Sequence, residues 1–72
     1  MTASAPVTAR IREDLSSGHL RSGQKILQEQ LAARYGVSRI PLREALNELQ
    51  AEGLVVHEPN RGYFVAQLRA QD

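Results

Sequence analysis

The chain has 72 residues, of which 42% are apolar and 24% are charged, and its formal net charge is +1. This length accommodates one small domain, and the composition is typical of a globular chain rather than a disordered or membrane-spanning one. The absence of cysteine excludes disulfides and thiolate metal sites. The first residues lack the segments of a secretory signal, and no apolar run reaches the roughly 18 residues of a spanning helix. We therefore expect a cytoplasmic protein.

The N-terminal part of the sequence predicts a tail followed by a short helix. Residues 1–6 are small or polar and end in a proline, so we expect a disordered N-terminal tail. Val7, Ile11 and Leu15 then recur every four residues among charged ones, which is the pattern of an amphipathic helix. Gly18 is placed to end this helix, because glycine adopts the left-handed conformation past a helix C-terminus at least cost.

A loop and a second helix should follow. Residues 19–28 are mostly polar and contain a Ser-Gly turn signal, so we expect a loop with a short edge strand near Leu20. The second helix is predicted over residues 28–35 and should end at Gly36. Its inward-facing side chains would be Leu31, Ala32 and Tyr35.

The third helix is predicted over residues 38–51, with only Gly36 and Val37 between it and the second helix. Ser38 is a favourable N-cap residue, whose hydroxyl should bond to the first turn. Pro41 falls at about the third helical position, where its missing N–H has no intrahelical partner. Two helices joined by so short a turn containing glycine are typical of a helix-turn-helix.

This third helix carries two different stripes. The apolar residues follow the i, i+3, i+4, i+7 spacing of a buried helix face and are Leu42, Ala45, Leu46 and Leu49. Arg39, Arg43 and Asn47 recur at i, i+4 and i+8, so they point in another direction. A basic stripe beside a buried one calls for a functional explanation.

The C-terminal part predicts a β-hairpin. Residues 54–58 and 63–67 are rich in β-branched and aromatic residues, and Pro-Asn-Arg-Gly between them is a turn-forming sequence. Over residues 7–67 the chain is therefore mainly α with a small β-hairpin, three helices plus a wing, which is the order of a winged helix-turn-helix domain. In that architecture the third helix enters the major groove of DNA, and the wing contacts the backbone or minor groove.

Three linked motifs carry a family resemblance: LAARYGVSRIPLREAL at residues 31–46, LQAEGLV at 49–55 and PNRGYFV at 59–65. Together they closely resemble the DNA-binding domain of GntR-family bacterial transcription regulators, over about residues 7–66. The Ser-Arg-x-Pro-Leu-Arg-Glu-Ala-Leu form with a Pro-Asn-Arg-Gly wing is similar to the FadR-type subgroup.

The resemblance implies a metabolite-responsive regulator, usually a repressor, that binds a double-stranded DNA operator with an inverted repeat as a homodimer. In the FadR-type subgroup an all-helical C-terminal domain binds the small-molecule effector and holds the dimer. This sequence contains no such segment, so the chain is either an isolated DNA-binding domain or an unusually short family member. In the first case, which the unclosed C-terminal end favours, residues 68–72 are the start of a linker to the absent effector-binding domain.

Arg39 and Arg43 are the candidate base-reading residues. A guanidinium can bond guanine O6 and N7 together, which is worth about 1–3 kcal/mol of discrimination per good pair. The alternative is a pair of solvated arginines bound to carboxylates. Ile40, on the same exposed face, stands where the family usually has threonine, so either a polar contact is lost or Ile40 supplies an apolar one, such as to a thymine methyl. Glu29 is an alternative groove-facing acceptor for a cytosine amino group.

The resemblance also places Ser38 and Pro41 against the DNA backbone and assigns Asn60, Arg61 and Gly62 to the wing contact. Arg61, at the wing tip, carries a positive charge suited to phosphate or to the minor groove. Asn60 and Gly62 serve the geometry of the turn first, because such turns need unusual backbone angles.

Other functional classes have less support. Two histidines stand far apart, and no glycine-rich phosphate loop is present, so we predict no enzyme, no cofactor and no metal site. The competing class is a winged helix that binds proteins without a DNA partner. The salt dependence of binding distinguishes a DNA-binding winged helix from a protein-binding one, since counterion release requires affinity for DNA to fall as the salt concentration rises.

Overall fold

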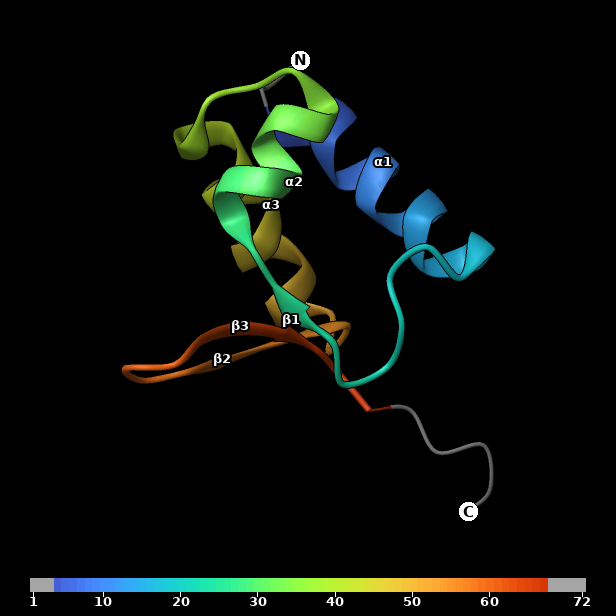
Figure 1. Ribbon diagram of the computed structural model, residues 1–72, viewed down its shortest axis with the longest axis vertical. Coiled ribbons are helices and arrows are strands. Elements are labelled where there is room, and N and C mark those ends of the chain that lie inside the picture. Colours follow the sequence, from blue (N-terminus) through green and yellow to red (C-terminus); the bar gives the residue numbers. More distant parts are fainter. Residues whose placement is uncertain (1–3, 68–72) are drawn as a thin grey trace.

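The computed structural model describes residues 4–67, which form three helices and one three-stranded sheet (Figure 1). The helices are α1 (Ser4–Ser17), α2 (Gln28–Tyr35) and α3 (Arg39–Ala51), and the strands are β1 (Lys25–Ile26), β2 (Val55–Glu58) and β3 (Gly62–Val65). This order confirms the predicted winged helix-turn-helix fold, in which the β2–β3 hairpin is the wing. None of the described helices is long and apolar enough to cross a membrane.

Helix α1 begins earlier than predicted. We expected residues 1–6 to be a disordered tail, but α1 starts at Ser4, so the prediction is wrong for residues 4–6. Pro6 falls in the first turn of the helix, where a missing N–H has no intrahelical partner to lose. A proline at such a position is compatible with a helix start as well as with a tail. Residues 1–3 and the predicted linker, residues 68–72, lie outside the described residues.

The turn between α2 and α3 has the predicted position. Helix α2 has the bounds expected from the sequence and ends at Gly36, whose φ of +69° is left-handed. The N–H of Gly36 donates to the carbonyl of Ala33 (3.2 Å), and the N–H of Val37 donates to the carbonyl of Ala32 (3.0 Å). These bonds close the end of α2, and α3 starts at Arg39, directly after Ser38.

The edge strand of the sheet is not where we predicted it. The sheet has the order β1-β3-β2 with antiparallel pairs, and β1 pairs Lys25 with Phe64 rather than lying near Leu20. Leu20 instead lies in the loop after α1, where its N–H donates to the carbonyl of Asp14 (3.0 Å). Its side chain is buried in the core. The backbone donor of Leu20 is therefore used to end α1 and not to pair a strand.

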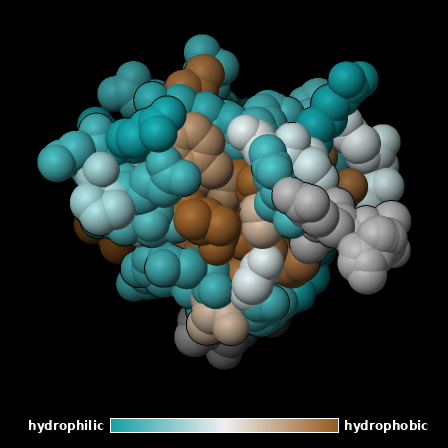
Figure 2. Space-filling view, turned by 90° about the horizontal axis from the view of Figure 1, so that it is seen from below, coloured by the Kyte–Doolittle hydropathy of each residue, from teal (hydrophilic) through white to brown (hydrophobic). Residues whose placement is uncertain are grey.

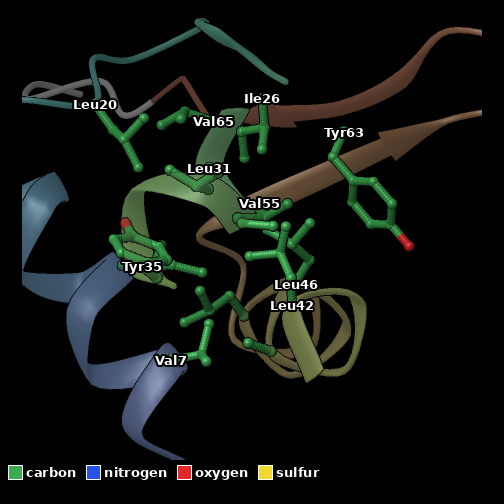
Figure 3. Packing of buried hydrophobic residues seen from close by; sticks show 14 residues of the cluster. Val7, Leu20, Ile26, Leu31, Tyr35, Leu42, Leu46, Val55, Tyr63 and Val65 are labelled. Atoms are coloured by element: carbon green, nitrogen blue, oxygen red, sulfur yellow. The ribbon is translucent and has the colours of Figure 1, made fainter. Parts of the chain in front are cut away.

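Helix α3 is the centre of the core (Figure 3). Its four predicted apolar residues are fully buried, and the predicted inward residues of α2 are buried as well. Fully burying one large apolar side chain contributes about 1.5–3 kcal/mol before the entropy of ordering it is counted. Side chains from α1, α2, the loop and all three strands surround α3: Val7, Ile11, Leu20, Ile26, Leu31, Tyr35, Val55, Tyr63 and Val65.

Three large apolar side chains remain exposed among the described residues. They are Leu27 (48%), Val56 (42%) and Ile40 (72%). Figure 2 views the molecule from the sheet side and shows apolar residues lying between polar ones on that face. Ile40 is the most exposed of the three and lies in the first turn of α3, beside the predicted basic stripe.

Candidate nucleic-acid interface

The N-terminal end of α3 has an N-cap residue without a capping bond. Ser38 has the extended backbone of an N-cap (φ −80°, ψ 176°), but its side chain makes no capping hydrogen bond to the described part of the chain. The prediction that the Ser38 hydroxyl bonds to the first turn of α3 is therefore wrong. A capping oxygen usually accepts from the N–H of the second or third helical residue, and the third residue here is Pro41, which has none. The exposed Ser38 hydroxyl can thus bond to an external group.

The basic stripe of α3 faces solvent, as its spacing predicted, since Arg39, Arg43 and Asn47 are all exposed. Nη2 of Arg39 lies 3.4 Å from Oε2 of Glu29, and these side chains are 63% and 81% exposed. An ion pair this exposed is weak, so a phosphate or a base acceptor can replace the carboxylate. The side chain of Arg43 makes no hydrogen bond or ion pair with any residue in the range 4–67. The alternative of carboxylate-paired arginines therefore applies to Arg39 alone.

Ile40 projects from the second position of α3 and adds nothing to the core. Arg39 precedes it, and Arg43 follows one turn later. An isoleucine held in water loses the stabilisation that burial would provide, about 0.8 kcal/mol for each CH₂-sized group. The N-terminal end of α3 therefore presents an exposed apolar group close to two exposed cationic ones.

The wing turn needs left-handed backbone at two positions. Asn60 has a φ of +66° and Gly62 a φ of +109°. Asparagine tolerates the left-handed region better than most residues, whereas the angle at Gly62 suits glycine. The N–H of Arg61 donates to the carbonyl of Glu58 (3.0 Å), which closes the turn. A Cβ added at Gly62 would lie 3.9 Å from Cε of Lys25, so the strand β1 places a lysine side chain beside the wing.

Arg61 is the exposed cation of the wing tip. Its side chain is 70% exposed, and its Nη1 lies 3.3 Å from Oε1 of Glu58. Its guanidinium carbon also lies 5.6 Å from the centre of the Phe64 ring, within the range of a cation–π contact. Both contacts are at the surface, so they orient Arg61 without removing it from solvent.

A hydrogen bond joins the wing to α3. The hydroxyl of Tyr63 on β3 donates to Oδ1 of Asn47 on α3 (2.9 Å). The ring of His57, on the neighbouring strand β2, has its centre 4.7 Å from the centre of the Tyr63 ring. The i, i+8 spacing from Arg39 pointed to Asn47, but nothing in the sequence indicated Tyr63 as its partner.

A buried carboxylate joins α1 to α2, and the sequence analysis missed it. Asp14 is only 8% exposed and accepts two hydrogen bonds from Arg34, from Nε (3.0 Å) and Nη2 (3.1 Å). The hydroxyl of Tyr35 also donates to Asp14 (2.6 Å). The bonds from Arg34, together with the bond from Tyr35, hold the pKa of the Asp14 carboxyl below its ordinary value. Burial and the bond to Asp14 raise the pKa of Tyr35 above the ordinary tyrosine value.

The predicted site residues form two groups on two elements. The first group lies at the start of α3 and comprises Ser38, Arg39, Ile40, Pro41 and Arg43; the second lies on the wing and comprises Asn60, Arg61 and Gly62. In Figure 1 the N-terminal end of α3 and the tip of the hairpin both lie on the left, away from α1. Among the described residues no cluster of three or more histidine, aspartate or glutamate side chains is arranged to hold a metal ion.

Known proteins resemble this chain in both sequence and fold. The family model for bacterial regulatory proteins of the gntR family matches residues 3–65. The Nta operon transcriptional regulator of Aminobacter aminovorans is 48% identical over 54 residues, a match that covers 75% of this chain and 26% of that regulator. The chain spans about a quarter of the length of the curated relatives it matches: 26%, 28% and 24% for three of them.

Solved structures share the fold. A transcriptional regulator, a GntR family member from Pseudomonas syringae pv. tomato str. DC3000, is 39% identical with a TM-score of 0.77, and the match covers 92% of this chain and 28% of that one. AraR(DBD), crystallised in complex with operator ORE1, is 31% identical with a TM-score of 0.77, covering 92% of this chain and 82% of that one. Because the family model matches nearly the whole chain, and solved relatives have the same fold, the chain belongs to the gntR family of bacterial regulatory proteins.

Proposed function

We propose that this chain is the sequence-specific, double-stranded DNA-binding domain of a bacterial transcription regulator, with no enzymatic activity. The observation that carries the proposal is the division of α3, whose apolar face is fully buried while Arg39, Ile40 and Arg43 face solvent. The crystallised complex of AraR(DBD) with an operator supports the same use of this fold. In the proposed complex α3 enters the major groove, and the wing lies on the backbone or in the minor groove.

The first turns of α3 read the bases in this proposal. Arg39 and Arg43 each bond guanine O6 and N7, because the planar guanidinium matches that pair of acceptors. Arg43 has no intramolecular partner in the described range to give up, and Arg39 has only its exposed contact with Glu29. Ile40 contacts a thymine methyl, the apolar group that the major groove offers.

The backbone contacts come from the start of α3 and from the wing. The Ser38 hydroxyl, which makes no intrahelical cap, donates to a phosphate, and Pro41 packs beside it. The unpaired N–H groups and positive dipole end of α3 favour an anion at the same place. Arg61 bonds a phosphate or enters the minor groove, while Asn60 and Gly62 shape the turn that holds it out.

The whole regulator is proposed from the resemblance. We infer that it belongs to the FadR-type subgroup, works as a cytoplasmic homodimer on an inverted repeat, and responds to a small-molecule effector through a domain outside this sequence, acting as a repressor. Curated relatives have about three quarters of their length outside the matched region, which leaves room for such a domain. Each copy of the winged helix would contact one half-site.

A duplex titration tests the proposal. A preferred duplex is first selected from a random library and then compared with a scrambled duplex at two salt concentrations. We expect tighter binding to the selected duplex, and log affinity should fall linearly with log salt because bound counterions are released. Binding should be weak for the 72-residue chain, since it presents one half-site reader without the dimer. If neither duplex binds, the alternative of a protein-interaction module without a DNA partner is favoured over the proposed function.

A further inference from the structure

Asn47 occupies a position on α3 that the proposed base and backbone contacts leave unused. It follows Arg39 by eight residues and Arg43 by four, so it lies on the same side of the helix, and it is exposed. The one hydrogen bond described for its side chain is with Tyr63, a buried residue of the central strand β3. Figure 3 shows the Tyr63 hydroxyl pointing away from the other labelled core residues.

The bond from Tyr63 determines which end of the Asn47 amide is free. A tyrosine hydroxyl that donates to Oδ1 leaves the two N–H donors of Nδ2 facing other groups. An asparagine that reads adenine must accept with its oxygen and donate with its nitrogen at once. The Tyr63 bond uses one of the two lone pairs of Oδ1 and neither N–H of Nδ2, so the donors of Asn47 are its most available groups and suit a partner that accepts hydrogen bonds. Phosphate oxygens are such a partner.

The position of Asn47 along α3 also favours phosphate over a base edge. Eight residues of helix separate it from Arg39, which is about 12 Å along the helix axis. Recognition helices place their N-terminal residues on the base edges, and the major groove is about 12 Å wide. A residue about 12 Å from the base-reading end therefore lies near the rim of the groove, where the phosphates are.

We propose that Asn47 donates a hydrogen bond from Nδ2 to a phosphate oxygen at the rim of the major groove, and that Tyr63 is the positioning residue that orients its amide. The inference rests on the proposed DNA-binding function. It adds the Asn47 contact to the DNA contacts assigned from charge and motif. It also gives Tyr63, a buried residue of β3, an indirect effect on DNA binding through Asn47. Tyr63 itself does not touch DNA in this arrangement.

A double-mutant cycle on DNA affinity tests the pair. The variants are Asn47→Ala, Tyr63→Phe and the double variant, with Ser16→Ala, an exposed polar residue of α1, as the control. We expect Asn47→Ala to weaken binding to the selected and scrambled duplexes alike, by about tenfold, the scale of a hydrogen bond to a charged group. The salt slope should not change, because no charge is removed.

The Tyr63→Phe variant separates positioning from a structural role. It keeps the buried ring, and its melting curve checks that the domain folds. We expect it to weaken DNA binding by roughly threefold in the wild-type background and by nothing further in the Asn47→Ala background. Equal effects in both backgrounds would show that Tyr63 acts on DNA binding independently of Asn47, and this would overturn the positioning role.

A neutral phosphate analogue identifies the contacted group. Methylphosphonate is placed at one phosphate at a time along the selected duplex. We expect one position per half-site at which it weakens the wild-type chain but not Asn47→Ala. The phosphate contact is overturned if no such position exists, if Asn47→Ala binds like Ser16→Ala, or if Asn47→Ala changes the preference at one base pair. A wild-type chain that binds no duplex would instead reject the proposed DNA-binding function.

Discussion

Asp14 should be the polar residue whose loss most weakens the attachment of α1 to α2. The substitution Asp14→Ala removes the acceptor of three hydrogen bonds, two from Arg34 and one from Tyr35. Arg34 is 44% exposed in its side chain and can turn to water. The Tyr35 residue is 6% exposed, so its hydroxyl is left without its partner in the interior. The stability loss should therefore follow mainly from Tyr35.

The size of the stability loss in Asp14→Ala follows from the hydrogen bond between Tyr35 and Asp14. A hydrogen bond to a charged group contributes about 1.5–3 kcal/mol to stability. Alanine is a better helix former than aspartate by up to about 0.7 kcal/mol, so the measured loss is smaller than the bond itself. The free energy of unfolding of a 72-residue domain is roughly 4–11 kcal/mol. We therefore expect a loss of about 1–2 kcal/mol and a fall in Tm on the order of 10 °C.

Urea and thermal unfolding followed by circular dichroism measure this loss. The control is Glu13→Ala, which removes the neighbouring exposed carboxylate of α1 and should change stability by less than about 0.5 kcal/mol. If Asp14→Ala and Glu13→Ala unfold alike, the buried network does not hold α1 to α2 and the reasoning fails. Tyr35→Phe should reproduce most of the Asp14→Ala loss, because it deletes the same bond.

Three further substitutions or base changes test the DNA-binding proposal. Arg43→Ala should lose about 1–3 kcal/mol of binding to the selected half-site and little to scrambled DNA in a competition assay; equal losses on both would contradict base reading. Arg61→Ala should weaken all duplexes evenly and reduce the salt slope by about 1, and an unchanged slope would exclude a phosphate contact. Replacing thymine by deoxyuridine in the selected half-site removes one methyl group, which should weaken the wild-type chain about fourfold but leave Ile40→Ala unaffected; no loss at any thymine would reject the methyl contact. Finally, the pKa of Asp14 is lowered in the folded state, so its contribution is present above about pH 4 and is lost as pH falls through the folded-state value; Asp14→Asn should flatten that acid dependence in urea titrations.

Local pattern predicted most of the secondary structure. Residues 28–35 formed the expected helix because the apolar spacing lies within the segment and Gly36 follows it directly. The start of α1 was misplaced, because Pro6 fits either a tail or a first turn. Strand β1 was missed for a different reason: it has two residues and exists through its pairing with β3, which lies far along the chain.

For the candidate site, too, the sequence predicted the features that depend on neighbouring residues of one helix. The exposure of Arg39 and Arg43 could be predicted because it depends on their angle from the apolar stripe of the same helix. Pro41, three residues after Ser38, removes one of the two N–H groups that a capping hydroxyl could bond, and this pairing of residues is visible in the sequence. The assigned contacts of these residues with DNA stay predictions that the substitutions above test.

The sequence by itself determined three helices, the short turn, the wing and an exposed basic stripe, because each depends on residues within a few positions of one another. Only the tertiary structure decided the partners of Asp14 and of Asn47. Asp14 meets Arg34 across 20 positions of sequence, and Tyr63 meets Asn47 across 16. No periodicity links residues so far apart, since their meeting depends on how α1, α2 and the sheet pack around α3. Core packing therefore buries the apolar face of α3, leaves Arg39, Arg43 and Asn47 exposed, and places Asn47 within hydrogen-bond distance of Tyr63 on the wing.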